Sequence, residues 1–396
     1  MLILLYGYYG YNNLGDDLFE YIYKKYFESK NLNYIIMNPS NLNIDYENVS
    51  KVDIIFLGGG EIINDYFIIP IFKYIKYHNL NYVSICGASI GYNNKLSLEY
   101  IKFIDKCIFR NKLDIIDNNN YYYDNDIVFS LKNYINLDDY KTEIIKNTIG
   151  YYLIDKMSDD KYEILKKFTI YIIKNYKIRF IIFHEEHDLL IINQLIEDCN
   201  LKKDNYEIIK RNNNLDILKE IYKNSKHLCL RYHSHIICYL FKFQFISFPL
   251  SDKTLSFNKY YDIKYSFNLE EMKKLINIQN IKFTELKFNM ENIDNFFNIE
   301  IYKENIKNKL LTIWGVYYEI YDNFIKILKN KDNILDIDLY INYISNQIEL
   351  NVLNNINTNY RYGIIIKLKD LLNRYEKDNI ILQSEFIKIM TNIYGK

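Results

Sequence analysis

Short apolar runs alternate with amphipathic stretches up to about residue 262 of the chain. An apolar run bounded by Gly, Asn or Asp is typical of a buried strand, and the stretches between the runs have the spacing of amphipathic helices. Strands that alternate with helices in this way are typical of a parallel sheet covered on both faces. The strands predicted by this pattern are Leu2–Tyr6, Tyr34–Met37, Asp53–Leu57, Tyr82–Cys86, Lys106–Phe109, Ile127–Phe129, Thr148–Leu153, Arg179–Phe183, Tyr206–Ile209, His227–Leu230 and Gln244–Phe248.

Helices are predicted between these runs, and one polar stretch separates the strands into two series. The predicted helices are Asp17–Ser29, Phe67–His78, Asp159–Tyr176, Leu189–Cys199, Leu215–Asn224 and His233–Phe241. The stretch Lys132–Lys146 is more polar and lies between the two series of strands. The pattern therefore predicts an α/β protein with two Rossmann-like doubly wound domains, residues 1–146 and 147–266, that face one another.

The character of the chain changes after about residue 266. No Gly or Pro interrupts it before Gly315, and Asn305–Lys329 and Tyr362–Arg374 have helical spacing. We expect residues 267–396 to form a mainly helical extension. Its apolar faces would pack on the protein or assemble a homo-oligomer.

The charge balance and the lack of a signal or membrane-spanning segment limit the kinds of partner and compartment that fit this chain. The chain has 396 residues, and 50 Lys and Arg residues balance 50 Asp and Glu residues. A polyanion-binding protein normally carries a basic excess, so nucleic acid and anionic membrane surfaces are poor candidates for its partner. The N-terminus lacks the features of a signal peptide, and no run approaches the ~20 apolar residues of a membrane span. The five cysteines show no CxxC or Cys/His zinc pattern. These features indicate a soluble protein of a reducing compartment, the cytoplasm, with no metal site.

Glycine is scarce in this chain, which makes its positions informative. There are 42 Tyr and 23 Phe residues but only 12 Gly and 3 Pro, as expected of a genome rich in A and T. Eight glycines fall in three clusters, each after a predicted strand: Gly7–Gly15, Gly58–Gly60 and Gly87–Gly91. None matches the GxGxxG or P-loop pattern. Each cluster alone is explained by a tight turn, but three at the carboxyl edge of one sheet indicate a ligand-binding crevice.

Two aspartates follow the first cluster at the expected start of a helix. Asp16 or Asp17 is the natural N-cap, which would leave the other to face the crevice. A helix N-terminus beside a glycine-rich turn favours an anion. Ser89 lies in the third cluster, at the same expected edge.

The densest group of candidate side chains in the second series is the turn Leu230–His235. Arg231 begins a predicted helix, where a cation is unfavourable unless an anion is bound, and its planar fork suits phosphate or carboxylate. His233 and His235 are two residues apart and therefore point to different faces of a helix, which disfavours a shared metal and favours an acid–base role. Arg110, Lys253 and His184 also follow predicted strands, although the position of Lys253 slightly favours a solvated lysine.

The ordered set of motifs resembles the polysaccharide pyruvyl transferase family. Gly7–Asp17 (GYYGYNNLGDD) resembles the opening G-x-x-G-x-x-N-x-G-D-(D/E) of that family, and Asp53–Asp65 resembles its strand followed by three glycines and an Asp. Ile108–Arg110 resembles its v-x-R-(D/N) segment, with Asn111 where Asp is usual. Arg231–Lys253 resembles its R-x-H…P…(Y/S)-D-x-K stretch, with Lys253 one position early. The resemblance covers about residues 1–265.

This resemblance implies a fold of the GT-B type with the active site between the domains. It also implies transfer of a pyruvyl group from phosphoenolpyruvate to two hydroxyls of a glycan, which gives a cyclic ketal and releases phosphate. No cofactor is required. His233 is the expected acid and Asp16 the expected base, with Asp17 as the second choice. The residues expected to bind substrate are Arg231, Arg110, Lys253, Asn13, Gly10, Gly15, Gly58, Gly59, Gly60, Ser89 and His184.

Two other functions fit the same pattern. One is a glycosyltransferase of the same architecture that uses a nucleotide sugar, with Glu185 and Glu186 available for the ribose and base. The other is a carbohydrate-binding or scaffolding protein without activity. The presence of Asp16, Arg231 and His233 argues against the scaffold, and Asn111 argues mildly for it.

Overall fold

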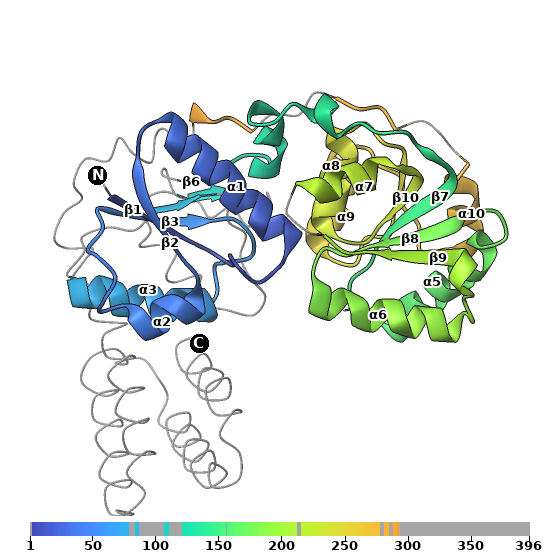
Figure 1. The fold of residues 1–396 in the computed structure, drawn as a ribbon, viewed down its shortest axis with the longest axis horizontal. Coiled ribbons are helices and arrows are strands. Elements are labelled where there is room, and N and C mark those ends of the chain that lie inside the picture. The colour runs from blue at the N-terminus through green and yellow to red at the C-terminus, as the bar shows by residue number, and fades with distance from the viewer. Residues whose placement is uncertain are drawn as a thin grey trace, which may run out of the picture.

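The computed structural model describes residues 2–78, 84–86, 107–110, 121–155, 157–211, 215–277, 281–284, 288–291 and 293 (Figure 1). The helices predicted at 305–329 and 362–374 lie outside the described residues, and so do Ser89 and the glycine cluster at 87–91. In the described part of the chain, none of the helices combines the length and apolar character needed to cross a bilayer.

The first half of the chain forms a parallel sheet with helices on both faces. The strand order is β2-β1-β3-β4, with bounds β1 Leu2–Tyr6, β2 Asn33–Met37, β3 Ile54–Gly58 and β4 Ser84–Cys86. Helix α1 (Leu14–Ser29) lies on one face, and α2 (Pro39–Asp45) and α3 (Asp65–His78) lie on the other (Figure 1). β3 is buried along its whole length, as expected of a central strand in a covered sheet.

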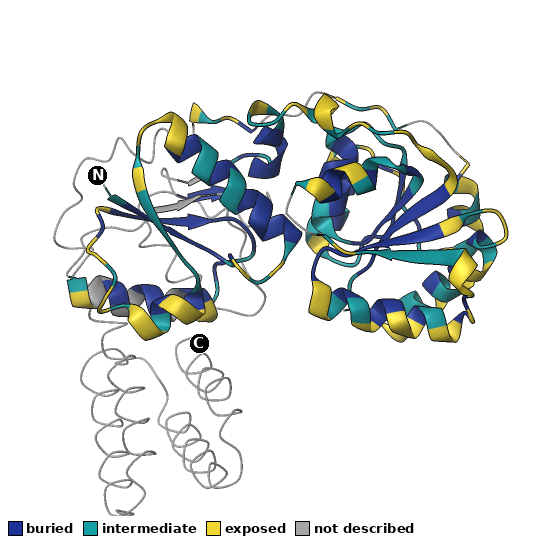
Figure 2. Ribbon diagram, in the orientation of Figure 1, coloured by how far each residue is buried: buried dark blue, intermediate teal, exposed yellow. Residues whose placement is uncertain are grey.

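The second half forms a five-stranded parallel sheet of the same kind. Its order is β11-β10-β7-β8-β9, with bounds β7 Ile145–Tyr152, β8 Lys177–Ile181, β9 Tyr206–Ile209, β10 Asn224–Cys229 and β11 Phe245–Ser247. The helices are α5 Asp159–Ile172, α6 Glu185–Asp198, α7 Asp216–Tyr222, α8 Tyr232–Leu240, α9 Asp252–Tyr260 and α10 Leu269–Leu275. Figure 2 shows the inner strands of both sheets buried, the edge strands β2 and β9 half-buried, and the outer sides of the helices exposed.

Two apolar cores hold these layers together, and one of them crosses between the halves. The first core packs α5, α6 and α10 against one face of the second sheet, through residues such as Phe168, Leu195 and Met272. The other joins α1 to α7 and α8 across the short 3-10 helix η2 (Ile127–Asn133). The two halves therefore share apolar packing as well as a polar boundary.

The prediction of a strand at Ile127–Phe129 was wrong. The segment is the 3-10 helix η2, because the Asp126 side chain accepts the Val128 N–H at 2.9 Å and caps a helical turn. All residues from Ile127 to Leu131 are buried, and a short apolar run that is buried all round has no period that distinguishes helix from strand. The strand that pairs with β5 (Cys107–Phe109) is instead β6 (Tyr121–Tyr123), which the pattern did not predict.

Helix α1 begins three residues earlier than predicted. Its N-cap is Asn13, whose side chain accepts the Gly15 N–H, so neither Asp16 nor Asp17 is the cap. Both aspartates lie in the first turn of the helix instead, where a carboxylate is favourable for the macrodipole. β1 and β9 have the predicted bounds, and most other predicted strands and helices have shifted ends; α6 begins at Glu185 rather than Leu189.

Candidate active site

A cavity of about 520 Å³ lies where the two halves meet, and its walls are the turns that follow the strands. We call it the central cavity. Tyr8 and Asn13 follow β1, Gly60 follows β3, and Arg110 follows β5. From the second half, its walls include Ile154, Phe183, Arg231, Tyr232, His233, Ser251 and Lys253. This position, beyond the carboxyl ends of parallel strands, is where open α/β sheets bind their ligands.

Three helices begin at this cavity. The N-caps of α1, α8 and α9 are Asn13, Arg231 and Ser251, and all three line the central cavity. A helix N-terminus carries a partial positive charge and unpaired backbone N–H groups. The convergence of three such ends on one cavity favours an anionic ligand.

The start of α1 is held by the second half of the protein. The Leu14 N–H donates to the Phe183 carbonyl at 2.9 Å, and Asn13 forms an isolated antiparallel bridge with His184. Asp17 pairs with Arg211 at 2.5 Å. These contacts fix the first turn of α1, and with it Asp16, relative to the second domain.

Asp16 is a buried carboxyl group at the cavity wall. The Asn13 side-chain amide donates to its Oδ2 at 2.7 Å, and a Cβ at Gly60 would lie 3.1 Å from its Oδ1. Burial raises the pKa of Asp16 to about 7, against the opposing charge of Arg110. A carboxyl group with this pKa exchanges a proton readily at neutral pH, which suits a general acid or base.

His233 lies beside Asp16's helix and has an unpaired ring nitrogen. Its Nε2 is buried and makes no hydrogen bond within the described residues, and it lies 3.8 Å from Asp126 Oδ2. A Cβ at Gly15 would lie 1.9 Å from His233 Nδ1, so only glycine leaves room for this ring. Burial lowers the pKa of His233, although Asp126 opposes the shift. Burial therefore disfavours the protonated ring, and a further anion beside it would favour protonation.

Asp126 anchors Arg110, a residue of the cavity wall. It accepts from Arg110 Nη1 at 2.8 Å, and both side chains are almost fully buried. Burial would raise the pKa of Asp126, but the adjacent His233 and Arg110 outweigh it and hold the pKa at about 2. The guanidinium of Arg110 also lies over the Tyr232 ring, 4.9 Å from its centroid. Asp126 therefore fixes both Arg110 and η2.

The remaining cations of the cavity pair with acids from distant segments. Arg231 pairs with Asp188 and donates from Nε to the Leu153 carbonyl at 2.7 Å. Asp188 is buried and also accepts the backbone N–H groups of Phe183 and His184. Lys253 Nζ lies 2.6 Å from Glu61 Oε1. Burial lowers the pKa of Lys253, and Glu61 opposes the shift.

Sequence reasoning missed these acids because their roles depend on long-range pairing. The sequence assigned no role to Asp126 or Asp188, and none to Glu61, although Glu61 lies in the Asp53–Asp65 motif directly after the three glycines. The signal that was available for Asp126 is its place before a short apolar run, which is typical of an N-cap. Tyr8, which also lines the cavity, is one tyrosine among 42 and carries no signal of its own.

A scan of protein-family models and a search of the curated proteins each found no significant match. Among solved structures, two of UDP-GlcNAc 2-epimerase from Methanocaldococcus jannaschii are similar to the chain. The complex with UDP-GlcNAc and UDP gives a TM-score of 0.52 at 10% identity, with 75% of this chain and 98% of that chain covered. The second gives 0.50 at 12% identity, with 75% and 99% covered. The fold is of the GT-B type. At these identities the likeness extends to the fold alone.

The structure brings seven of the predicted site residues of this GT-B-type protein to the central cavity. They are Asn13, Asp16, Gly60, Arg110, Arg231, His233 and Lys253. Gly15 contributes through the space that it leaves for His233. In the described part of the chain, no group of three or more His, Cys, Asp or Glu side chains is arranged to hold a metal ion.

The other predicted residues do not line the cavity. Asp17 turns to Arg211, and Gly10 serves a turn with a φ of +80°. Gly58 and Gly59 pack against aromatic rings of their own domain, where a Cβ would lie 2.1 Å from Tyr9 Oη and 2.2 Å from the Phe19 ring respectively. His184 is buried behind the wall, with its ring 4.5 Å from that of His187.

Proposed function

We propose that this chain is a carbohydrate-active enzyme that binds a phosphorylated donor in the central cavity. The observation that carries the proposal is the meeting of three helix N-termini with Arg110, Arg231 and Lys253 at one cavity. Phosphate is the anion that such an arrangement suits best, because it accepts hydrogen bonds from backbone N–H groups and from cationic side chains together.

The fold comparison favours a nucleotide sugar as the donor. The solved structure of highest TM-score reported above is an epimerase in complex with UDP-GlcNAc and UDP. If this chain binds a similar molecule, its diphosphate would lie at the N-termini of α8 and α9, beside Arg231 and Lys253. Those groups would stabilise the charge that develops on the leaving diphosphate.

Phosphoenolpyruvate is the second candidate donor, and a different observation favours it. The residues that resemble the pyruvyl transferase motifs come from separate segments, yet Asn13, Asp16, Arg231 and His233 line the same cavity. A carboxylate and a phosphate on one small molecule would match Arg110 and Arg231, which lie on different walls. The first hydroxyl adds to the central carbon while the methylene carbon takes a proton. The second hydroxyl then displaces phosphate and completes the ketal.

Asp16 and His233 have the same division of work with either donor. Asp16, with its pKa raised to about 7, accepts the proton of the attacking sugar hydroxyl. The neutral His233 gains a proton when a dianionic phosphate enters and then acts as the acid. For phosphoenolpyruvate that proton goes to the methylene carbon, and for a nucleotide sugar it neutralises the leaving phosphate.

One experiment separates the two donors. The purified chain is titrated with UDP-GlcNAc, UDP and phosphoenolpyruvate by calorimetry, and each donor is then incubated with β-linked galactose, mannose and N-acetylhexosamine acceptors. Release of UDP indicates a nucleotide-sugar enzyme, and release of inorganic phosphate indicates pyruvyl transfer. If none of these anions binds, the phosphorylated-donor proposal is contradicted.

Two histidine variants locate the activity. We expect His233→Gln to lower kcat by roughly 10²–10⁴-fold, the range for loss of a general acid. His187→Gln is the matched control, since His187 lies outside the cavity with a side chain that is 44% exposed. Equal activity in the two variants would place the chemistry elsewhere.

A further inference from the structure

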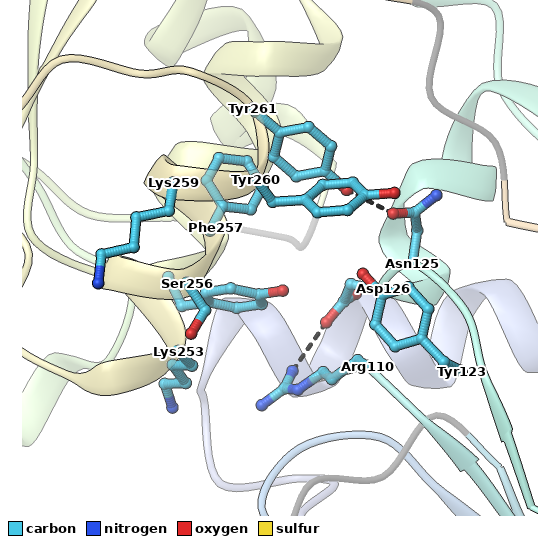
Figure 3. A pocket seen from close by; sticks show the side chains of 11 residues that line it. Arg110, Tyr123, Asn125, Asp126, Lys253, Ser256, Phe257, Lys259, Tyr260 and Tyr261 are labelled. Atoms are coloured by element: carbon cyan, nitrogen blue, oxygen red, sulfur yellow. Dashed lines mark hydrogen bonds and ion pairs between the residues drawn. The ribbon is translucent and has the colours of Figure 1, made fainter. Parts of the chain in front are cut away.

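A second pocket opens beside the central cavity, and five of its eleven lining residues are aromatic (Figure 3). Its volume is about 370 Å³, which is within the range of small-molecule sites. It shares Arg110, Tyr232 and Lys253 with the central cavity, so the two spaces meet at these side chains. We call it the aromatic pocket; its rings are Tyr123, Tyr232, Phe257, Tyr260 and Tyr261.

The rings of the aromatic pocket hold one another in place. Tyr261 packs edge-to-face on Phe257, with centroids 4.6 Å apart, and on Tyr260, with centroids 4.8 Å apart. The Tyr261 hydroxyl donates to Asn125 Oδ1, which ties α9 to the segment before η2 (Figure 3). Tyr260 is 54% exposed, and therefore offers its ring to a ligand at the mouth of the pocket. The pocket is formed before any ligand arrives.

The aromatic pocket shares two ion-paired cations with the central cavity, but the N-caps Asn13, Arg231 and Ser251 line the central cavity and not this pocket. Arg110 pairs with Asp126 at 2.8 Å, and Lys253 pairs with Glu61 at 2.6 Å. Asn125 and Ser256 add neutral polar groups, and Lys259 lies exposed at the edge. A pocket of aromatic faces with a few neutral hydrogen-bonding groups suits an uncharged ring that carries hydroxyls. Apolar C–H faces of such a ring pack on the aromatic rings, and its hydroxyls reach the amide and hydroxyl groups.

We infer that the aromatic pocket is the acceptor subsite and that it binds a neutral pyranose ring of a glycan. This inference rests on the proposed function, because it supplies the second substrate of that reaction. A sugar in this pocket presents a hydroxyl past Arg110 and Tyr232 to the donor in the central cavity. The exposed mouth at Tyr260 leaves room for the rest of a longer glycan.

Direct binding tests this subsite without any donor. The full chain is titrated with methyl β-galactoside, methyl α-mannoside and methyl β-N-acetylglucosaminide by saturation-transfer NMR and calorimetry, and with uridine as a contrast. Tyr260→Ala removes the exposed ring, and Tyr77→Ala is the matched control because Tyr77 is 55% exposed and lies on α3. Circular dichroism checks that each variant is folded.

We expect at least one of the three sugars to bind, and Tyr260→Ala to weaken it about five- to tenfold while Tyr77→Ala leaves it unchanged. Binding of uridine in place of the sugars would overturn the inference in favour of a nucleoside subsite. Failure of all three sugars to bind, or an equal loss in both variants, would also overturn it. Sugar binding by a chain that binds no phosphorylated donor would refute the proposed donor site and leave the acceptor subsite standing.

Discussion

Two buried carboxyl groups near the central cavity have pKa values that are shifted in opposite directions. On the α1 wall, Asp16 accepts a hydrogen bond from the neutral Asn13, and burial raises its pKa to about 7. Behind Arg110, Asp126 contacts the guanidinium, and its pKa is held at about 2. Both carboxyl groups are buried, so the direction of each pKa shift depends on the group that contacts the carboxylate, a neutral amide or a guanidinium. One carboxyl group is available to move protons, and the other is a permanent counter-ion.

The largest expected effect comes from removing the counter-ion. Asp126→Asn leaves Arg110 as a buried charge without its carboxylate, which should lower the free energy of unfolding by about 3–5 kcal/mol. Urea unfolding at pH 7 measures this. Asp138→Asn is the control, because the Asp138–Lys141 pair is exposed on the surface and its loss should change the free energy of unfolding little. Similar losses in the two variants would show that Asp126 is not a buried anchor.

The second test uses the pH dependence of stability. The folded-state pKa of Asp16 is above its unfolded value of 3.8, so the folded protein binds more protons, and stability falls as pH rises from about 4 to about 7. The span of three pKa units corresponds to roughly 4 kcal/mol. Asp16→Asn should therefore be more stable than the wild type at pH 8 and about equal to it at pH 4.

Asp126 contributes in the opposite sense, because its folded-state pKa is below 3.8. Its stabilisation is present above pH 4 and is lost as the pH falls through about 2. Unfolding curves at pH 3, 5 and 8 for Asp16→Asn and the wild type separate the two contributions. Between pH 5 and pH 8 the wild type should lose more stability than Asp16→Asn. If the two proteins lose the same amount, the pKa of Asp16 is not raised.

The third test moves the α1 wall without changing its charge. Gly15→Ala places a methyl group 1.9 Å from His233 Nδ1, and the ring must shift, at a cost of about 1–3 kcal/mol in unfolding free energy. We also expect kcat to fall, because the displaced His233 ring no longer lies where the proposed acid is needed. Gly10→Ala introduces backbone strain at a φ of +80° but meets no atom closer than 3.9 Å. That variant should keep its activity.

The smallest effect is expected at the neighbour of Asp16. Asp17→Asn weakens the pair with Arg211, and for a partly buried pair of this kind we expect a loss of about 1 kcal/mol. Its kcat should match the wild type, because Asp17 faces away from the cavity. A kcat for Asp17→Asn as low as that for Asp16→Asn would reverse the roles given to these two residues.

The fold was predictable from the sequence because buried parallel strands are continuous apolar runs. β1 was predicted to the residue, and the turns after the strands were recognised by scarce Gly and Arg. η2 was missed because its five buried residues have no period, and Asp126 was missed with it. The sequence identified the Asp16–Asp17 pair but did not separate the two, since their roles depend on Asn13 as the N-cap and on Arg211 across the domain boundary.

The acids that pair with Lys253 and Arg231 could not be predicted from neighbouring residues in the sequence. Lys253 and Glu61 are 192 residues apart, and Arg231 and Asp188 are 43 apart. No spacing rule links such positions, and a single sequence offers several acids that could serve. Only the folded structure, which brings the carboxyl ends of the strands together, decides which acid meets which cation.

The hydrogen bond from Leu14 to Phe183 ties the position of Asp16 to the closure of the molecule. Asp16 belongs to the first domain, but the first residue of its helix donates a hydrogen bond to a carbonyl of the second domain. Any rotation that draws the domains apart to admit substrate breaks this bond and the Asp17–Arg211 pair, and moves Asp16 away from His233. If Asp16 and His233 act as proposed, they would lie together only in the closed arrangement, and proton transfer would be confined to a state from which bulk water is excluded.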